Sequence, residues 1–169
     1  MTTVRPLGLA DGPAWAALFR EATRTHPAAF ITTATEAAAL SEDAIAARMD
    51  GDLLGAFDGT DLIGFGSLVR TERPSLRHRA ELGPLYATSR HHGTGAGQAL
   101  MDALVAHAHG HDVAWLDLWV AENNARARAF YRRNGFSDVA RRPDAVRGAD
   151  GPETDILMTR CLEAGAGRG

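Results

Sequence analysis

The feature of this 169-residue chain that most restricts its fold is a glycine-rich turn between an extended segment and a helical one. Residues 79–87 alternate in the manner of a strand but are interrupted by Gly83-Pro84. Proline cannot donate to a sheet ladder, so we expect a bulge or a splay at this point. The turn Gly93–Gly97 follows, and residues 97–109 then carry apolar side chains at helical spacing. The pattern predicts a strand, a turn and a helix in succession.

Such a turn is suited to binding a phosphate. A helix N-terminus offers N–H groups and a partial positive charge, and glycines let the backbone approach a ligand closely. The same turn also occurs where a strand and a helix only pack tightly. It is not a P-loop, because no Gly-Lys-Ser/Thr follows. It also departs from the Gly-x-Gly-x-x-Gly dinucleotide pattern, and the next strand lacks the acidic end that this pattern requires.

The remaining elements predict an α/β (α+β) fold with a mixed sheet. One domain is expected over residues 1–162, followed by a flexible tail at 163–169. The apolar periodicity predicts helices at 14–25, 41–49, 97–109 and 124–134. It predicts strands at 3–5, 53–57, 62–69, 79–87, 114–120, 136–141 and 154–160, with a tight turn at Asp58-Gly59.

Composition excludes several classes of protein. All 18 basic residues are arginine, against 21 acidic residues, so the net charge of −3 argues against a non-specific nucleic-acid binder. The single Cys161 excludes an internal disulfide and a cysteine-based zinc cluster. No apolar run reaches the roughly 20 residues of a membrane span, and the N-terminus lacks a signal-peptide pattern. We expect a cytoplasmic protein.

A second motif follows the glycine turn. Its fixed positions are Val120, Asn124, Ala127, Phe130-Tyr131 and Gly135-Phe136. Together with His92-Gly-Thr-Gly-Ala-Gly97, it resembles the GNAT superfamily of acyl-CoA N-acyltransferases. The resemblance covers roughly residues 3–160 and is most specific over 79–136.

The glycine turn departs from that family at one position. His92 stands where the family usually has Arg or Gln, and an alternative frame would begin at Arg90. The His92 frame is preferred because it fits the distance from Leu85-Tyr86-Ala87 and the helix start at Gly97-Gln98. The change leaves phosphate binding by the backbone amides intact as an expectation.

The resemblance implies a GNAT-like, mostly antiparallel central sheet, splayed between its fourth and fifth strands and flanked by roughly four helices. It also implies acetyl-CoA as cosubstrate and a homodimer as the assembly to expect. The pantetheine arm would pair with the backbone of residues 85–87 like an added strand. Arg90, Arg126 or Arg128 would contact a phosphate. The implied cofactor-binding residues are Leu85, Tyr86, Ala87, Arg90, His92, Gly93, Thr94, Gly95, Ala96, Gly97, Gln98, Asn124 and Arg126.

The catalytic candidates follow from the chemistry of the implied reaction. An amine attacks the thioester and a thiolate leaves, so a phenol near the sulfur can act as general acid. Tyr131 is the candidate, with core packing as the alternative. Glu81 is the candidate base, and a solvated strand carboxylate is the competing interpretation. Asp117 is a weaker candidate, because strand alternation would turn it away from the site.

The acceptor side is less specific. A hairpin loop over residues 141–152 is expected to lie over the acceptor pocket, and Trp119, Asp155 and His78 are candidate substrate contacts. The expected acceptor is a primary amine of a small molecule. A protein or peptide acceptor and a non-catalytic acyl-CoA-binding module are the alternatives. His107, His109 and His111 are expected to form a solvated helix end, and no metal is expected.

Overall fold

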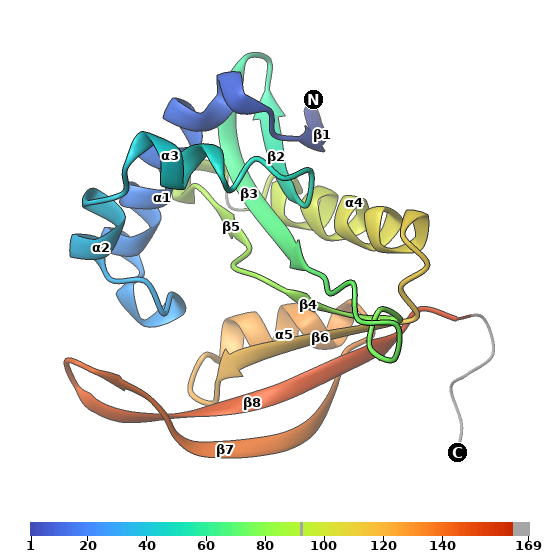
Figure 1. Ribbon diagram of the computed structural model, residues 1–169. Helices are drawn as coiled ribbons and strands as arrows, with labels where there is room; N and C mark the ends of the chain where they lie inside the picture. The colour runs from blue at the N-terminus through green and yellow to red at the C-terminus, as the bar shows by residue number, and fades with distance from the viewer. Residues whose placement is uncertain (92, 164–169) are drawn as a thin grey trace. The chain divides into compact units, whose positions relative to one another are not determined.

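The computed structural model of the protein describes residues 1–91 and 93–163 (Figure 1). Contacts between Cα atoms divide the chain into two compact units. The first unit comprises Met1–Val69 and Gly83–His107. The second unit comprises residues 70–82 and the chain from Ala108 onward. His92, the first residue of the predicted glycine turn, lies outside the described residues, and so does the tail beyond residue 163.

The first unit contains an antiparallel sheet in the order β1-β2-β3-β5. The predicted turn joins β2 to β3, and Gly59 there has a φ of +59°, a conformation that glycine adopts at little cost. The strands are β1 (Thr2–Pro6), β2 (Leu53–Asp58), β3 (Asp61–Val69) and the short β5 (Tyr86–Ala87).

One face of this sheet is covered by α1 (Gly12–Thr25), α2 (Ala34–Ala38) and α3 (Glu42–Ala46) (Figure 1). The helical periodicity that predicts α1 is confirmed. Trp15 and Phe19 stack with ring centroids 5.0 Å apart, and both rings meet Phe65 of β3 edge-on. Aromatic rings of this size bury much apolar surface, so this cluster is a large part of the core of the unit.

The opposite face of the sheet is covered by α4 (Ala96–Gly110), the helix that follows the glycine turn. Ala96 and Leu100 of this helix pack against Ala56 and Ile63. The register of β2 with β3 shifts between Ala56 and Phe57, so a β-bulge lets Ile63 join this side. The helix is thereby fixed against the sheet through its first turns.

The second unit contains a sheet in the order β4-β6-β8-β7, in which β4 and β6 are parallel and the other pairs are antiparallel. Along β6, Leu116, Leu118 and Val120 are buried, whereas the alternate residues are half-buried. One face of the strand therefore carries the core. The strands are β4 (Arg79–Leu82), β6 (Trp115–Ala121), β7 (Ser137–Gly148) and β8 (Gly151–Cys161).

The strand predicted over residues 79–87 is split. Its first part, β4, pairs with β6, and its last part, β5, pairs with β3. The break falls at Gly83-Pro84, as the sequence predicts. A Cβ at position 83 would collide with the Ser67 hydroxyl, so a larger residue here requires the Ser67 side chain to move.

The helix α5 (Ala125–Arg133) explains much of the second sequence motif by local structure. Asn124 caps its start, because the Asn124 Oδ1 accepts from the Ala127 N–H at 3.1 Å. Gly135 has a φ of +83°, and the N–H groups of Gly135 and Phe136 bond back to carbonyls of the last turn. This is a Schellman ending, with Phe136 buried after it.

The hairpin loop predicted over residues 141–152 is a hairpin, but its strands are longer than predicted. β7 continues to Gly148 and β8 begins at Gly151, so nearly all of this segment is a long hairpin. The register shifts between Arg142 and Val146 accommodate Pro143, which an edge strand tolerates. Charged side chains along this edge strand disfavour its pairing with another chain.

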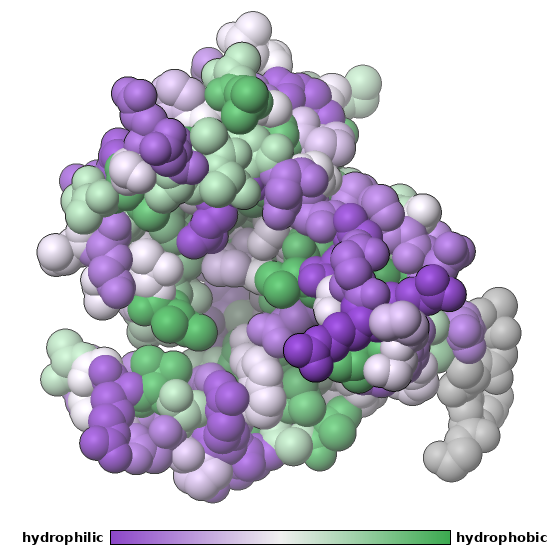
Figure 2. Space-filling model, viewed as in Figure 1, coloured by the Kyte–Doolittle hydropathy of each residue, from purple (hydrophilic) through white to green (hydrophobic). Residues whose placement is uncertain are grey.

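The surface of the described residues is mixed in character. Figure 2 shows hydrophilic and hydrophobic residues interspersed over the face in view. Within the described residues, the helices are too short or too polar to cross a bilayer.

Candidate functional site

The glycine turn of the first unit has the geometry of an open backbone cradle. Gly93 and Gly95 have φ values of +82° and +90°. Apart from the glycine and its chain neighbours, no atom of the described residues lies within 4 Å of the place where a Cβ would stand on either residue. The first N–H groups of α4 have no acceptor within the helix. Thr94 is partly engaged, because its hydroxyl donates to the His91 carbonyl at 2.7 Å. Ala96 is buried as an anchor of the helix.

The segment predicted to pair with the cofactor arm is Leu85–Ala87. Tyr86 and Ala87 form β5, whose described strand partner is β3. An edge strand presents unpaired N–H and C=O groups on its other side. The Tyr86 ring is buried with Phe30 and Phe65, and its hydroxyl donates to the Glu21 Oε1 at 3.3 Å. Burial raises the pKa of Tyr86, so its side chain serves the core while its backbone lies in the strand.

The other cofactor candidates differ in how they are engaged. Arg90 and Arg126 are exposed, and the Gln98 amide donates to Asp102 at 2.9 Å. Asn124 is used as the cap of α5. Arg128 donates to the Glu122 carbonyl at 2.9 Å and to Asp138 at 2.8 Å, so its contacts are structural.

In the second unit, Glu81 lies beside Asp117. The parallel register aligns the two residues, and neighbours in register share one face of a sheet. Strand alternation therefore places Asp117 on the same face of the sheet as Glu81. Burial, and then the charge of Asp117, raise the pKa of Glu81, whereas Arg142 lowers it.

Asp117 is itself held in an ion pair. Its carboxylate accepts from the Arg79 Nε at 2.9 Å and Nη2 at 2.6 Å, and the Thr159 hydroxyl donates to it at 2.6 Å. A bidentate pair of this kind satisfies the carboxylate and fixes its orientation. Glu81, in contrast, is exposed. Of the two carboxylates, Glu81 is the more exposed to solvent.

Tyr131 lies in α5 between Phe130 and Phe136, with ring centroids at 5.6 Å and 5.9 Å. Burial raises the pKa of Tyr131 to about 12. The phenol is therefore fully protonated at neutral pH, which is the state that a general acid requires. Its packing against two rings also fits the alternative of a core aromatic.

The three candidate substrate contacts occupy different settings. The Trp119 ring lies under the Arg142 guanidinium, whose carbon is 4.0 Å from the ring centroid. Asp155 is buried and its Oδ2 is 3.4 Å from the Arg142 Nη2. The side chain of His78 is exposed, and its carbonyl accepts from the N–H groups of Ala114 and Trp115. Sequence reasoning missed Arg142, because its partners are distant in sequence.

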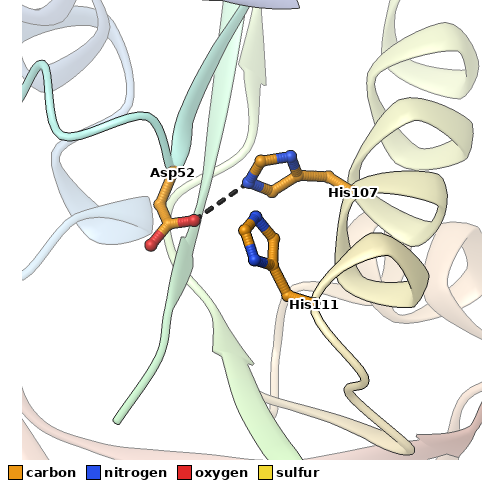
Figure 3. Close-up of side chains that lie close together, drawn as sticks. All are labelled: Asp52, His107 and His111. Atoms are coloured by element: carbon orange, nitrogen blue, oxygen red, sulfur yellow. Dashed lines mark hydrogen bonds and ion pairs between the residues drawn. The ribbon is translucent and has the colours of Figure 1, made fainter. Parts of the chain in front are cut away.

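The histidines near the end of α4 are not all solvated. In the first unit, the His107 Nε2 lies 2.9 Å from the Asp52 Oδ1, and both side chains are largely buried (Figure 3). The expectation of a solvated His107 is wrong. Asp52 precedes β2 and is 55 residues away in sequence, so helical spacing alone does not reveal the pair.

These two units define an acyl-CoA-dependent transferase class by fold and by the order of their motifs. The model of the acetyltransferase (GNAT) family matches residues 15–136, more than half of the chain, and the chain belongs to this family. An uncharacterized N-acetyltransferase of Mycobacterium tuberculosis is 33% identical over 101 residues. That alignment covers 60% of this chain and 61% of the relative.

Solved structures share the fold at low sequence identity. The structure of yncA from Salmonella typhimurium with its cofactor acetyl-CoA has a TM-score of 0.83 at 19% identity, covering 99% of this chain and 98% of the other. The ribosomal-protein-S18-alanine N-acetyltransferase of Escherichia coli has a TM-score of 0.72 at 23% identity, covering 100% and 99%. The predicted GNAT-like mixed, mostly antiparallel fold is confirmed.

Proposed function

We infer that the protein transfers an acetyl group from acetyl-CoA to a primary amine of a small molecule. In this proposal, residues 93–98 bind the diphosphate through backbone N–H groups, and the backbone of residues 85–87 pairs with the pantetheine arm. Glu81 is the general base and Tyr131 the general acid. Family membership supports the reaction class.

The residues of the glycine turn fit the diphosphate. Two consecutive oxyanions need close approach of the backbone and a positive local potential. The open space above Gly93 and Gly95 meets the first need, and the N-terminus of the 15-residue helix α4 meets the second. Arg90 and Arg126 are exposed cations that could add to phosphate binding.

The observation that carries the proposal is the setting of Glu81. It is an exposed carboxylate with a raised pKa, beside a second carboxylate that is neutralised by Arg79. A raised pKa makes a carboxylate a better proton acceptor. An incoming ammonium group can therefore lose a proton to Glu81 and attack as the neutral amine.

The bonds and protons of the proposed transfer balance. The amine nitrogen forms a bond to the acetyl carbon, and the bond from that carbon to sulfur breaks. Nitrogen loses two protons, one from the ammonium group before the attack and one as the amide forms, and Glu81 accepts each in turn and passes it to solvent. The sulfur receives one proton from the Tyr131 phenol. Tyr131 recovers its proton from solvent, and the products are the N-acetyl amine and the free thiol of CoA.

A panel of acceptors tests this proposal. Release of the CoA thiol is measured with acetyl-CoA and small primary amines, and in parallel with short peptides that have free N-termini. We expect turnover of small amines, and a Glu81→Gln variant slower by about 100-fold or more that still binds acetyl-CoA. Tight binding of acetyl-CoA without turnover of any acceptor would contradict the enzyme proposal. Preference for peptides would contradict only the small-molecule acceptor.

A further inference from the structure

One face of the sheet in the second unit gathers charged groups around a tryptophan. In the strand registers, Asp117 lies opposite Thr159, Trp119 opposite Leu157, and Arg142 opposite Asp155. Glu81 extends the same row through β4. The alternate residues of β6 and β8, such as Leu118 and Met158, point into the core. Polar side chains from all four strands therefore share the face that the core leaves open.

Arg142 has an unusual position on this face. Its guanidinium carbon is 4.0 Å from the centroid of the Trp119 ring, within the range of a cation–π contact. This contact restrains the position of the guanidinium group, which carries five N–H donors. The side chain is 49% exposed. An arginine restrained in this way can offer its N–H donors to an anionic group.

The ion pair with Asp155 does not occupy all of the N–H donors of Arg142. The contact joins one nitrogen, Nη2, to Asp155 Oδ2 at 3.4 Å, which is long for a charged hydrogen bond. A guanidinium group has five N–H donors in a fork that matches a carboxylate. By comparison, Arg79 makes two short contacts to Asp117, so that pair is closed.

Two exposed groups on this face, Glu81 and Arg142, are of opposite charge type. Glu81 is exposed and negative, and Arg142 is half-exposed and positive. The two groups lie close enough for the Arg142 charge to lower the pKa of Glu81. A ligand that carries an ammonium group and an acidic group can complement both charges at once.

We propose that Arg142, stacked on Trp119, binds the acidic group of the acceptor, so that the preferred acceptors carry a carboxylate near the amine, as amino acids do. This inference rests on the proposed acetyl transfer with Glu81 at the amine. Arg142 acts as a specificity-determining residue. A plain amine lacks the second contact and binds more weakly.

The test compares acceptors that differ only in this charge. L-Phenylalanine and L-phenylalaninamide, and L-leucine and L-leucinamide, are assayed with acetyl-CoA for kcat and KM. In the Arg142→Gln variant we expect kcat/KM for the free acids to fall about 10- to 100-fold, mostly through KM. The amides should fall by clearly less than the free acids, since they make no charged contact with Arg142 and share only the effect of its charge on Glu81. Arg142→Lys, which keeps the charge but loses the flat fork, should lie between.

Arg141→Gln is the matched control. Arg141 is the preceding residue and pairs instead with Glu122 at 2.7 Å and 3.1 Å. This variant should keep the wild-type ratio of acid to amide, and thermal melts should show that both variants fold. An equal loss for acids and amides in Arg142→Gln, or an unchanged ratio, would overturn the inference while leaving acetyl transfer intact. Failure of the wild type to acetylate any amine contradicts the proposed function itself, and the inference with it.

Discussion

Glu81 and Asp117 stand opposite each other in the parallel pairing of β4 with β6, and the charge of Asp117 adds to burial in raising the pKa of Glu81. A base must be ionised to accept a proton. With Glu81 as the proposed base, we expect the rate to fall as the pH drops through its raised pKa, so that the acid limb lies above the usual range for a glutamate. The pH profile of the activity should therefore depend on Asp117, the neighbour of Glu81.

Asp117→Asn removes the charge that raises the pKa of Glu81 and leaves Arg79 nearby. We expect the acid limb of kcat/KM to move to lower pH. Asp138→Asn is the control. Asp138 lies on β7, and its ion pairs are with Arg128 and Arg132 of α5. A pH-rate profile of the two variants checks this. If Asp117→Asn leaves the limb where it is, Glu81 is not the group that the limb reports.

The Tyr131 phenol has a pKa of about 12, so it stays protonated at neutral pH. Tyr131→Phe removes the proton donor and keeps the ring, so kcat should fall by about 100-fold or more. The thermal midpoint should hardly change, because the ring contacts with Phe130 and Phe136 remain. Full activity in steady-state assays would assign Tyr131 to packing alone.

A substitution in the glycine turn can separate an effect on acetyl-CoA binding from an effect of backbone strain. Gly95→Ala adds a Cβ to a residue with a φ of +90°, which costs about 1 kcal/mol or more in backbone strain and narrows the cradle. Acetyl-CoA should then raise the thermal midpoint less than in the wild type. Differential scanning fluorimetry with and without acetyl-CoA measures this.

Gly59→Ala is the control for that experiment. Gly59 has a φ of +59° in the β2–β3 turn, where a Cβ would likewise meet open space. This variant should lose comparable stability and keep the full shift with acetyl-CoA. A reduced shift in both variants would mean that strain, and not the cradle, explains the Gly95→Ala result.

Asp11 contributes to stability through a pair at the start of the first unit. Its carboxylate accepts from Arg5 at 2.7 Å and 2.9 Å and from the Gly8 N–H, and the Arg5 hydrogen bond is the main cause of its pKa of about 2. Because this pKa is lowered on folding, the stabilisation is present above pH 4 and is lost as the pH falls towards 2.

Asp11→Asn should therefore lower the free energy of unfolding by about 1 to 2 kcal/mol at neutral pH, less than the full pKa shift implies, since Arg5 is half-exposed. Urea melts at several pH values check this. The difference from the wild type should shrink below pH 4. A constant difference down to pH 2 would show that the ion pair is not its source.

The sequence predicts local structure well where one residue has one conformational role. Gly135 ends α5 with a positive φ, Asn124 caps its start, and Gly83-Pro84 breaks the strand, and each follows from backbone chemistry. The same residues show that much of the second motif is structural. Motif spacing alone does not separate a cap from a cofactor contact.

What sequence could not predict depends on strand register. Two register shifts in β7, at Asp138/Ala140 and at Arg142/Val146, decide that Arg142 lies opposite Asp155 and reaches Trp119. The Asp52–His107 pair likewise joins segments that no periodicity connects. Bulges and long-range pairs of this kind follow from packing, so their members emerge only in three dimensions.

The most direct test of the account follows the acetyl group itself. Acetyl-CoA labelled with ¹³C in the acetyl carbonyl is mixed with the protein and L-phenylalanine, and the products are followed by NMR and mass spectrometry. We predict that the label appears in an amide bond to the amino nitrogen, at a rate that Glu81→Gln lowers sharply. Label that remains on CoA, or that appears only as free acetate, would contradict the account.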